Sequence, residues 1–240
     1  VHVQSYDSYV TDFARFVETV VSPREEHRMV FAHSMGGAIA ILALERYPEM
    51  FEAAILSAPM CGMQTGKYPR IVARLLAGSC CLLGKRKDFA SLAGPRGFSD
   101  IPQFEGSSCT SKERYDYMFE KRLLDEHYRT YGGSYGWVLA GLRASRKLMR
   151  KENLAKIKTP VLLFAAGYDH MVDNDAIERF AELTDRTELI FMPDSRHEIF
   201  NADERTRTKY YDEIFRFIKE EEVKDYENGN EQTRKILGTV

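Results

Sequence analysis

The chain has 240 residues, of which 44% are hydrophobic and 29% charged, a composition that suits a soluble domain with one large core. Its formal net charge of −2 gives no overall attraction to nucleic acid, and no nucleic-acid partner is expected. No apolar run reaches the roughly 18 residues of a membrane-spanning helix. The four cysteines, Cys61, Cys80, Cys81 and Cys109, lack metal-ligand and disulfide-scaffold spacing, so we expect no metal. The adjacent Cys80 and Cys81 lie in an apolar stretch and are expected to be reduced core thiols, which favours a reducing compartment.

The first elements alternate between helix and strand. Residues 5–20 carry apolar side chains at helical spacing, and Ser22-Pro23 ends that pattern. Residues 29–32 form a short apolar run that predicts a strand buried on both faces, followed by a helix over 38–46. A second buried strand is predicted over 53–56.

A long insertion follows Pro59. Residues 60–153 are rich in Tyr, Arg, Lys and Gly and hold few β-branched runs. Within them, Thr110-Ser111-Lys112-Glu113 is a capping box, which predicts the start of a helix that extends to Tyr128. We expect this segment to form a helical cap over the ends of the strands.

Strand and helix patterns return after the insertion. Strands are predicted over 161–166 and 189–192, with helices over 175–184 and 204–220. This order predicts an α/β fold with a mostly parallel sheet. The expected organisation is a first core part over 1–59, a helical cap over 60–153, a second core part over 154–222 and a frayed polar tail over 223–240.

Ser34 lies at the junction between the first strand and its helix. A serine hydroxyl is a weak nucleophile that needs a base, exposure to substrate and donors for the oxyanion. A sharp strand-to-helix turn of the G-x-S-x-G type exposes the serine when the residues two positions away, here Ala32 and Gly36, are small. Gly37 lets the helix approach the sheet, and the backbone N–H of Met35 is expected to be one oxyanion donor. The elbow thus comprises Ala32, His33, Ser34, Met35, Gly36 and Gly37.

The acid and the base are expected in the chain order serine, acid, histidine. Asp169 follows the strand over 161–166, and His197 lies in the loop after the strand over 189–192. Asp173 and Asp175 are alternative acids, although Asp173 or Asn174 better suits the N-cap of the next helix. The other histidines precede the serine, adjoin it or the acid, or lie in the cap: His2, His27, His33, His127 and His170.

These motifs resemble bacterial lysophospholipases related to monoacylglycerol lipases, which have the α/β-hydrolase fold. The resemblance covers nearly all of residues 1–220 and is carried by several segments: Ala32-His33-Ser34-Met35-Gly36-Gly37, Ser57-Ala58-Pro59-Met60, Phe104-Glu105-Gly106, Gly132-Gly133 with Trp137, Ala166-Gly167-Tyr168-Asp169, Val172-Asp173-Asn174 and Arg196-His197-Glu198. It implies hydrolysis of the acyl ester of a lysophospholipid without a cofactor. It also implies a cytoplasmic location with peripheral contact to the inner face of a membrane.

One departure from that family concerns the N-terminus. Members have several strands and a His-Gly loop before the elbow, and the loop donates the second oxyanion N–H; here the elbow is already at Ser34. We therefore expect a fragment that lacks the first strands and leaves residues 29–32 at a sheet edge. Such a fragment is expected to aggregate and to be weakly active until the upstream segment is restored.

The cap is also the basic part of the chain. Residues 60–158 contain 19 Lys and Arg against 9 Asp and Glu, whereas the whole chain contains 34 and 36. Basic residues around the apolar stretch over 71–83 are typical of a membrane-surface element, but also of the solvated face of an ordinary helix. The residues concerned are Lys67, Arg70, Arg74, Lys85, Arg86 and Lys87.

The sequence as a whole favours a serine carboxylic-ester hydrolase with a lipid or acyl-ester substrate. Ser34 would attack the acyl carbonyl, His197 would take its proton, and Asp169 would orient the imidazole. The alternatives are a monoacylglycerol lipase, a general esterase, or a non-catalytic binding protein on the same fold. The sequence sets neither the head-group preference nor the oligomeric state.

Overall fold

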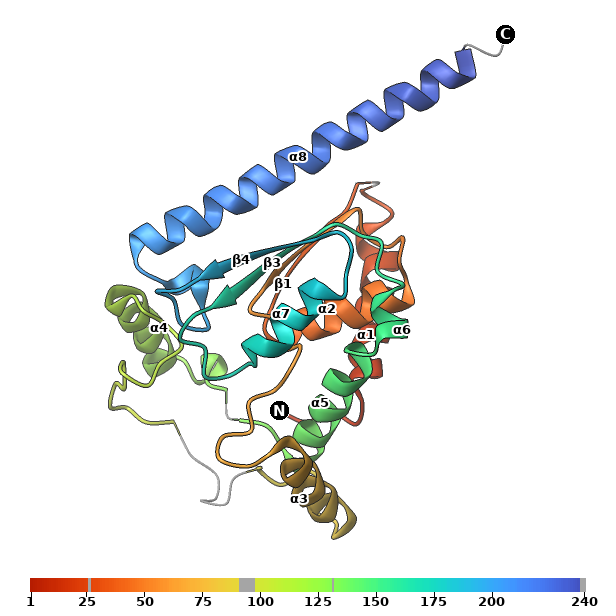
Figure 1. The fold of residues 1–240 in the computed structure, drawn as a ribbon. Helices are drawn as coiled ribbons and strands as arrows, with labels where there is room; N and C mark the ends of the chain where they lie inside the picture. Colours follow the sequence, from red (N-terminus) through yellow and green to blue (C-terminus); the bar gives the residue numbers. More distant parts are fainter. Residues whose placement is uncertain (26, 91–97, 131, 238–240) are drawn as a thin grey trace.

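A four-stranded parallel sheet forms the middle layer of the molecule, in the order β1-β2-β3-β4 (Figure 1). The computed structural model describes residues 1–25, 27–90, 98–130 and 132–237, with the side chains of the last helix up to Glu221. The strands are β1 (Met29–His33), β2 (Ala53–Ser57), β3 (Val161–Ala166) and β4 (Thr187–Met192). The α/β class with a parallel sheet, predicted from the order of elements, is confirmed.

The two central strands are buried along their whole length. Because side chains alternate along a strand, Leu56 and Leu163 face one core while Ile55 and Leu162 face the other. Burial on both faces explains why β2 and β3 are continuous apolar runs rather than alternating ones.

In the described part of the chain, four longer helices lie on the first face of the sheet (Figure 1), and the short helix α6 (Lys151–Leu154) adds Leu154 to the same core. Each of the four longer helices contributes buried apolar residues to this shared core, among them Val10, Ile41, Leu142 and Ile177. The helices are α1 (Tyr6–Phe16), which continues into a π-helical turn over Val17–Val21, α2 (Met35–Arg46), α5 (Tyr135–Leu148) and α7 (Asn174–Glu182).

Helix α8 (Glu204–Leu237) covers the second face through Tyr210, Ile214 and Phe217 and then runs on beyond the sheet (Figure 1). The prediction of a frayed tail over 223–240 is therefore wrong as far as Leu237. Six of the fifteen residues over 223–237 are Glu, Lys, Gln or Arg, which have high helix propensity and extend a helix already anchored to the core, although Asn228-Gly229-Asn230 has low propensity. Residues 238–240 lie outside the described part of the chain.

Strand β1 lies at the edge of the sheet, as expected for residues 29–32. It pairs with β2 on one side, and no strand in the described part of the chain pairs with its other side. Phe31 is 52% exposed, so the prediction of burial on both faces is wrong here. The core beneath α8 is built on β2, β3 and β4, and it does not extend over Phe31.

The insertion holds α3 (Arg70–Leu82), α4 (Lys112–Leu124), a 3-10 turn over Glu126–Tyr128, α5 and α6 (Lys151–Leu154). The hydroxyl of Ser111, not that of Thr110, caps α4, and Asp125 ends it before Tyr128. Helix α5 falls inside the predicted cap range, yet Leu142 and Leu148 belong to the main core. The cap is therefore not a separate unit over all of 60–153.

The cysteines and the helices can be compared with the predictions for disulfides and for membrane spans. All four cysteines are free, but Cys80 and Cys81 are half-buried on α3 rather than in the core. Within the described part of the chain, no helix is both long and apolar enough to cross a membrane.

Candidate active site

Ser34 occupies a strained turn between β1 and α2. Its φ of 54° and ψ of −121° lie outside the regions that residues with a side chain usually adopt. Two hydrogen bonds hold the turn: the Ser34 N–H donates to the Ser57 carbonyl at 3.1 Å, and the Met60 N–H donates to the Ser34 carbonyl at 2.9 Å. The end of β2 therefore fixes the conformation that exposes the hydroxyl.

In the elbow, Gly37 rather than Gly36 is packed closely against a neighbouring segment. A Cβ at Gly37 would lie 2.5 Å from the Cβ of Pro59, whereas one at Gly36 would meet no described atom within 4 Å. The expected need for a small residue at Gly36 is thus not supported by the packing of the described residues, and the close approach of helix and sheet depends on Gly37. Ala32 is half-buried in β1.

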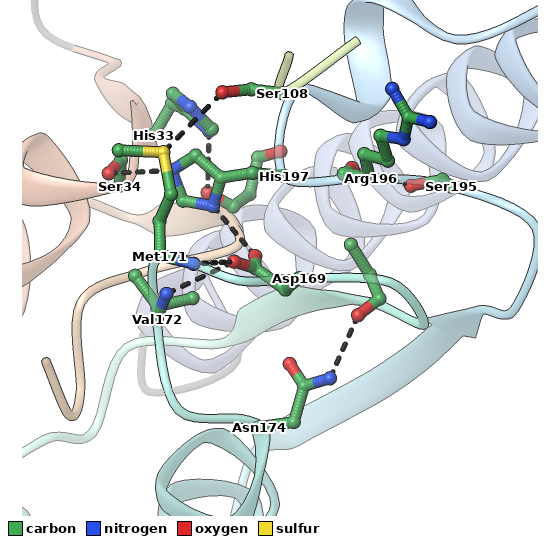
Figure 2. Close-up of polar contacts among 12 residues, drawn as sticks. His33, Ser34, Ser108, Asp169, Met171, Val172, Asn174, Ser195, Arg196 and His197 are labelled. Carbon is green, nitrogen blue, oxygen red and sulfur yellow. Dashed lines mark hydrogen bonds and ion pairs between the residues drawn. The ribbon is translucent and has the colours of Figure 1, made fainter. Parts of the chain in front are cut away.

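A hydrogen-bonded chain links Ser34, His197 and Asp169 (Figure 2). His197 Nε2 lies 2.8 Å from Ser34 Oγ, and His197 Nδ1 lies 2.6 Å from Asp169 Oδ2. The side chains of His197 and Asp169 are 3% and 0% exposed. With the Nδ1 proton donated to the carboxylate, Nε2 is free to accept the proton of the Ser34 hydroxyl.

The carboxylate of Asp169 is held by its own loop as well as by His197. Its Oδ1 accepts the N–H groups of Met171 at 2.8 Å and Val172 at 3.0 Å (Figure 2). Burial by itself raises the pKa of Asp169, but the hydrogen bond and charge of His197 together with these two N–H groups outweigh burial and leave the pKa below its ordinary value. Asp169 is therefore ionised at neutral pH.

The two alternative acids lie elsewhere. Asp173 forms an ion pair with Arg70, and Asp175 is exposed in the first turn of α7. Of the two predicted N-cap residues, Asp173 occupies the N-cap position of α7 and Asn174 is the first helical residue, but the Asp173 side chain makes no capping hydrogen bond because it is turned toward Arg70.

The sequence placed His33 in the elbow and excluded it as the base, and in the structure its ring lies beside that of His197. Its ring lies 4.6 Å from the ring of His197 and 5.0 Å from that of Phe200, centre to centre, and Nδ1 lies 3.0 Å from the Ser57 carbonyl. Burial, and secondly the neighbouring His197, lower the pKa of His33 to about 4. At neutral pH, His33 is thus an uncharged ring packed beside His197.

Arg196 connects the histidine loop to the insertion. Its Nη1 donates to the carbonyls of Phe104 at 3.0 Å, Ser107 at 3.3 Å and Cys109 at 3.1 Å. Its guanidinium also lies over the ring of Phe104. No spacing in the sequence indicates this role, because the accepting groups are backbone atoms about ninety residues away.

The six basic residues for which the sequence left open a lipid contact or a solvated face differ in their surroundings. Arg70 pairs with Asp173, and Arg86 donates to the Gln4 carbonyl at 3.1 Å. Arg74 lines a groove between α3 and α5. The remaining three are exposed: Lys67, Lys85 and Lys87.

Met35 is the first residue of α2, so its N–H lacks an intrahelical acceptor and points from the positive end of the helix. In the described ranges, no group of three or more His, Cys, Asp or Glu side chains could hold a metal ion. The chemistry within reach of these residues is acyl transfer through an activated serine.

Comparisons with known proteins point in the same direction. A family model described as "Serine aminopeptidase, S33" (Hydrolase_4) matches residues 1–204. Lysophospholipase L2 of Escherichia coli K12 is 31% identical over 183 residues, which are 76% of this chain and 53% of that protein. The probable lysophospholipase L2 of Haemophilus influenzae is 25% identical over 90% of this chain and 68% of its own length. The chain thus spans about half the length of the Escherichia coli relative.

Two solved structures share the fold. The monoacylglycerol lipase of Paleococcus ferrophilus gives a TM-score of 0.68 at 18% identity and covers 92% of this chain and 77% of its own. A soluble variant of the monoglyceride lipase of Saccharomyces cerevisiae gives 0.66 at 19% identity, over 91% and 71%.

Proposed function

The chain belongs to the Hydrolase_4 family of serine hydrolases, and on this premise we propose that it is a carboxylic-ester hydrolase that releases a fatty acid from a lysophospholipid. The observation that carries the proposal is the unbroken hydrogen-bonded chain from Ser34 through His197 to Asp169. The substrate class is supported by the similarity to the lysophospholipase L2 proteins.

The mechanism follows from the atoms in this chain. His197 Nε2 takes the proton of Ser34 as its oxygen attacks the acyl carbonyl, and the ionised Asp169 stabilises the resulting imidazolium. The backbone N–H of Met35 donates to the developing oxyanion. His197 then protonates the leaving glycerol oxygen, and a water molecule activated by His197 releases the fatty acid from Ser34.

Peripheral contact with the cytoplasmic face of a membrane is a further part of the proposal. Helix α3 and the residue after it present apolar side chains to solvent: Leu75 is 63%, Leu82 90% and Leu83 75% exposed. Lys85 and Lys87 lie just beyond them and are also exposed. An exposed apolar face next to basic side chains is suited to the surface of an anionic bilayer.

The nucleophile is tested by covalent labelling with a fluorophosphonate, which reacts with activated serines. We expect the protein to be labelled and Ser34→Ala to remain unlabelled. Ser57→Ala is the matched control, because Ser57 lies at the end of β2 rather than on the elbow. Labelling of the Ser34→Ala variant would refute the assignment, and a parent that resists labelling would favour a non-catalytic binding protein.

The substrate class needs a separate comparison. Turnover of lysophosphatidylcholine, a monoacylglycerol, a short-chain aryl ester and an aminoacyl anilide should be measured under the same conditions. The proposal expects the highest kcat/KM for the lysophospholipid. Preference for the monoacylglycerol or for the aryl ester would identify a lipase or a general esterase instead, and preference for the anilide would identify an aminopeptidase.

A further inference from the structure

A groove between α3 and α5 holds a concentration of arginines that the reaction does not use. Its cavity has a volume of about 530 Å³. Helix α3 contributes Arg74, Leu75 and Leu82, and the α5 side contributes Arg143, Arg146 and Arg150. Neither this cavity nor the adjoining one, which shares Arg74 and Arg146, includes Ser34, Asp169 or His197 in its lining.

The arrangement follows from helical spacing. Arg143, Arg146 and Arg150 follow one another at intervals of three and four positions, so they lie on one side of α5 and of the turn after it, and Lys147 adjoins Arg146. On α3, Gly78 and Ser79 face them, and a Cβ at Gly78 would meet no described atom within 4 Å. Small residues opposite long ones leave the hollow open.

Among the described residues, the lining of this cavity carries positive charge without an acidic side chain, whereas Asp173 and Asp175 line the adjoining cavity, where Asp173 pairs with Arg70. Lys147 is paired with Asp7 at 2.6 Å. No hydrogen bond or ion pair from any described residue engages the side chains of the four arginines, and no Asp or Glu lines this cavity; they are Arg74, Arg143, Arg146 and Arg150. Neighbouring like charges repel one another, and a bound anion relieves that repulsion.

The chemistry of the groove indicates the occupant. A guanidinium presents paired N–H donors that match two oxygens of a phosphate group. Leu75 and Leu82 stand beside these donors and are 63% and 90% exposed. A nucleic acid or a free phosphate would leave both leucines in water, whereas a phospholipid in a bilayer places its phosphate against the arginines and its acyl chains against the leucines.

We propose that the α3–α5 groove is a binding site for the phosphate group of an anionic phospholipid in a bilayer, separate from the catalytic serine. The site gives head-group preference to the peripheral contact proposed above, on which this inference rests; it does not depend on ester hydrolysis. With the phosphate bound in this groove, the α3 end of the molecule, opposite α8, would face the membrane (Figure 1).

Vesicle co-sedimentation tests the site without any turnover. The parent should bind vesicles of equimolar phosphatidylcholine and phosphatidylglycerol more tightly than vesicles of phosphatidylcholine alone. Arg143→Gln combined with Arg146→Gln should weaken binding to the anionic vesicles by roughly thirtyfold and should leave binding to the neutral vesicles within about twofold. Both side chains are exposed, so folding is preserved, and thermal melting verifies this.

The matched control is Arg205→Gln combined with Lys209→Gln, which makes the same charge change at exposed positions of α8. Binding by this control should stay within about twofold of the parent. If the control and groove variants lost equal amounts of binding to the anionic vesicles, net charge rather than a specific site would account for the binding, which would overturn the proposal. A parent with no preference for phosphatidylglycerol also overturns it.

Two further measurements separate the occupants and the proposals. Binding of inorganic phosphate and of duplex DNA in solution should also be measured. If either bound saturably, as tightly as the vesicles do, and the groove variant lost that binding, the occupant of the groove would be that ligand and not a phospholipid in a bilayer. Ser34→Ala should bind both kinds of vesicle like the parent, so a failure of ester hydrolysis leaves the vesicle result interpretable. If Ser34→Ala lost the preference for anionic vesicles, that preference would depend on the catalytic site, which would overturn the proposal for the groove.

Discussion

The imidazole rings of His33 and His197 lie 4.6 Å apart, centre to centre, with their planes inclined at 50°. His33 comes directly before Ser34 at the end of β1, and His197 lies in the loop after β4, so the contact joins the two halves of the site. Burial keeps His33 neutral, which allows a second imidazole to sit beside His197 without adding a positive charge there.

The first prediction concerns stability at acid pH. Unfolded His33 takes up a proton near its ordinary pKa of 6.5, whereas folded His33 does so only near 4. The unfolded state therefore binds more protons between these values, and the free energy of unfolding should fall as the pH drops through this window. His33→Phe, which keeps a ring against Phe200, should reduce that fall by roughly 1–3 kcal/mol.

Urea unfolding at about pH 7 and about pH 4.5 measures the difference. His27→Gln is the control for removing one histidine, since the side chain of His27 is 80% exposed. An identical pH dependence in the parent and in His33→Phe would show that His33 is protonated in the folded protein.

The second prediction assigns the acid. Asp169→Asn keeps the shape of the side chain but no longer holds the productive tautomer of His197, so kcat should fall by about 10⁴. Asp173→Asn removes the partner of Arg70 instead and should lower kcat by less than about tenfold. Steady-state hydrolysis of a short-chain ester compares the two variants, and the reverse ranking would identify Asp173 as the acid.

The third prediction concerns Arg196. Arg196→Met should lower the free energy of unfolding by roughly 1–3 kcal/mol, because the carbonyls of Phe104, Ser107 and Cys109 lose a shared donor. Turnover should fall as well, since the loop that carries His197 loses its link to the insertion. Arg196→Lys should recover part of both losses. The control Arg205→Met, at an exposed position of α8, should change neither quantity.

The fourth prediction contrasts two glycines. Gly78→Ala adds a Cβ into open space within α3, so the free energy of unfolding should rise by about 0.5–1 kcal/mol. Gly37→Ala places the same Cβ against Pro59, which must shift, and should destabilise the protein by about 1–3 kcal/mol and lower esterase activity through the elbow. Equal effects at both positions would contradict the packing described for the elbow.

Outside the insertion, the sequence alone determined the order of the strands and helices and most of their boundaries, whereas α3, α5 and α6 were not predicted individually. The strands are short apolar runs, and the helices are recognised by their periodicity, both of which are local properties of the chain. The identities of Ser34, Asp169 and His197 also followed from local order, because each lies directly after a predicted strand. The carboxyl ends of parallel strands meet at one edge of a sheet, which brings these loops together.

Only the tertiary structure decided the relationships between distant segments. The sequence favoured Asp169 over Asp173 but left both open, and the two are separated by their partners: Asp169 contacts His197, and Asp173 pairs with Arg70 of α3. The ring contact between His33 and His197, the carbonyls bound by Arg196 and the groove between α3 and α5 likewise join segments far apart in the chain. Periodicity shows which face a helix buries, but the partner of that face depends on how the elements pack together in three dimensions.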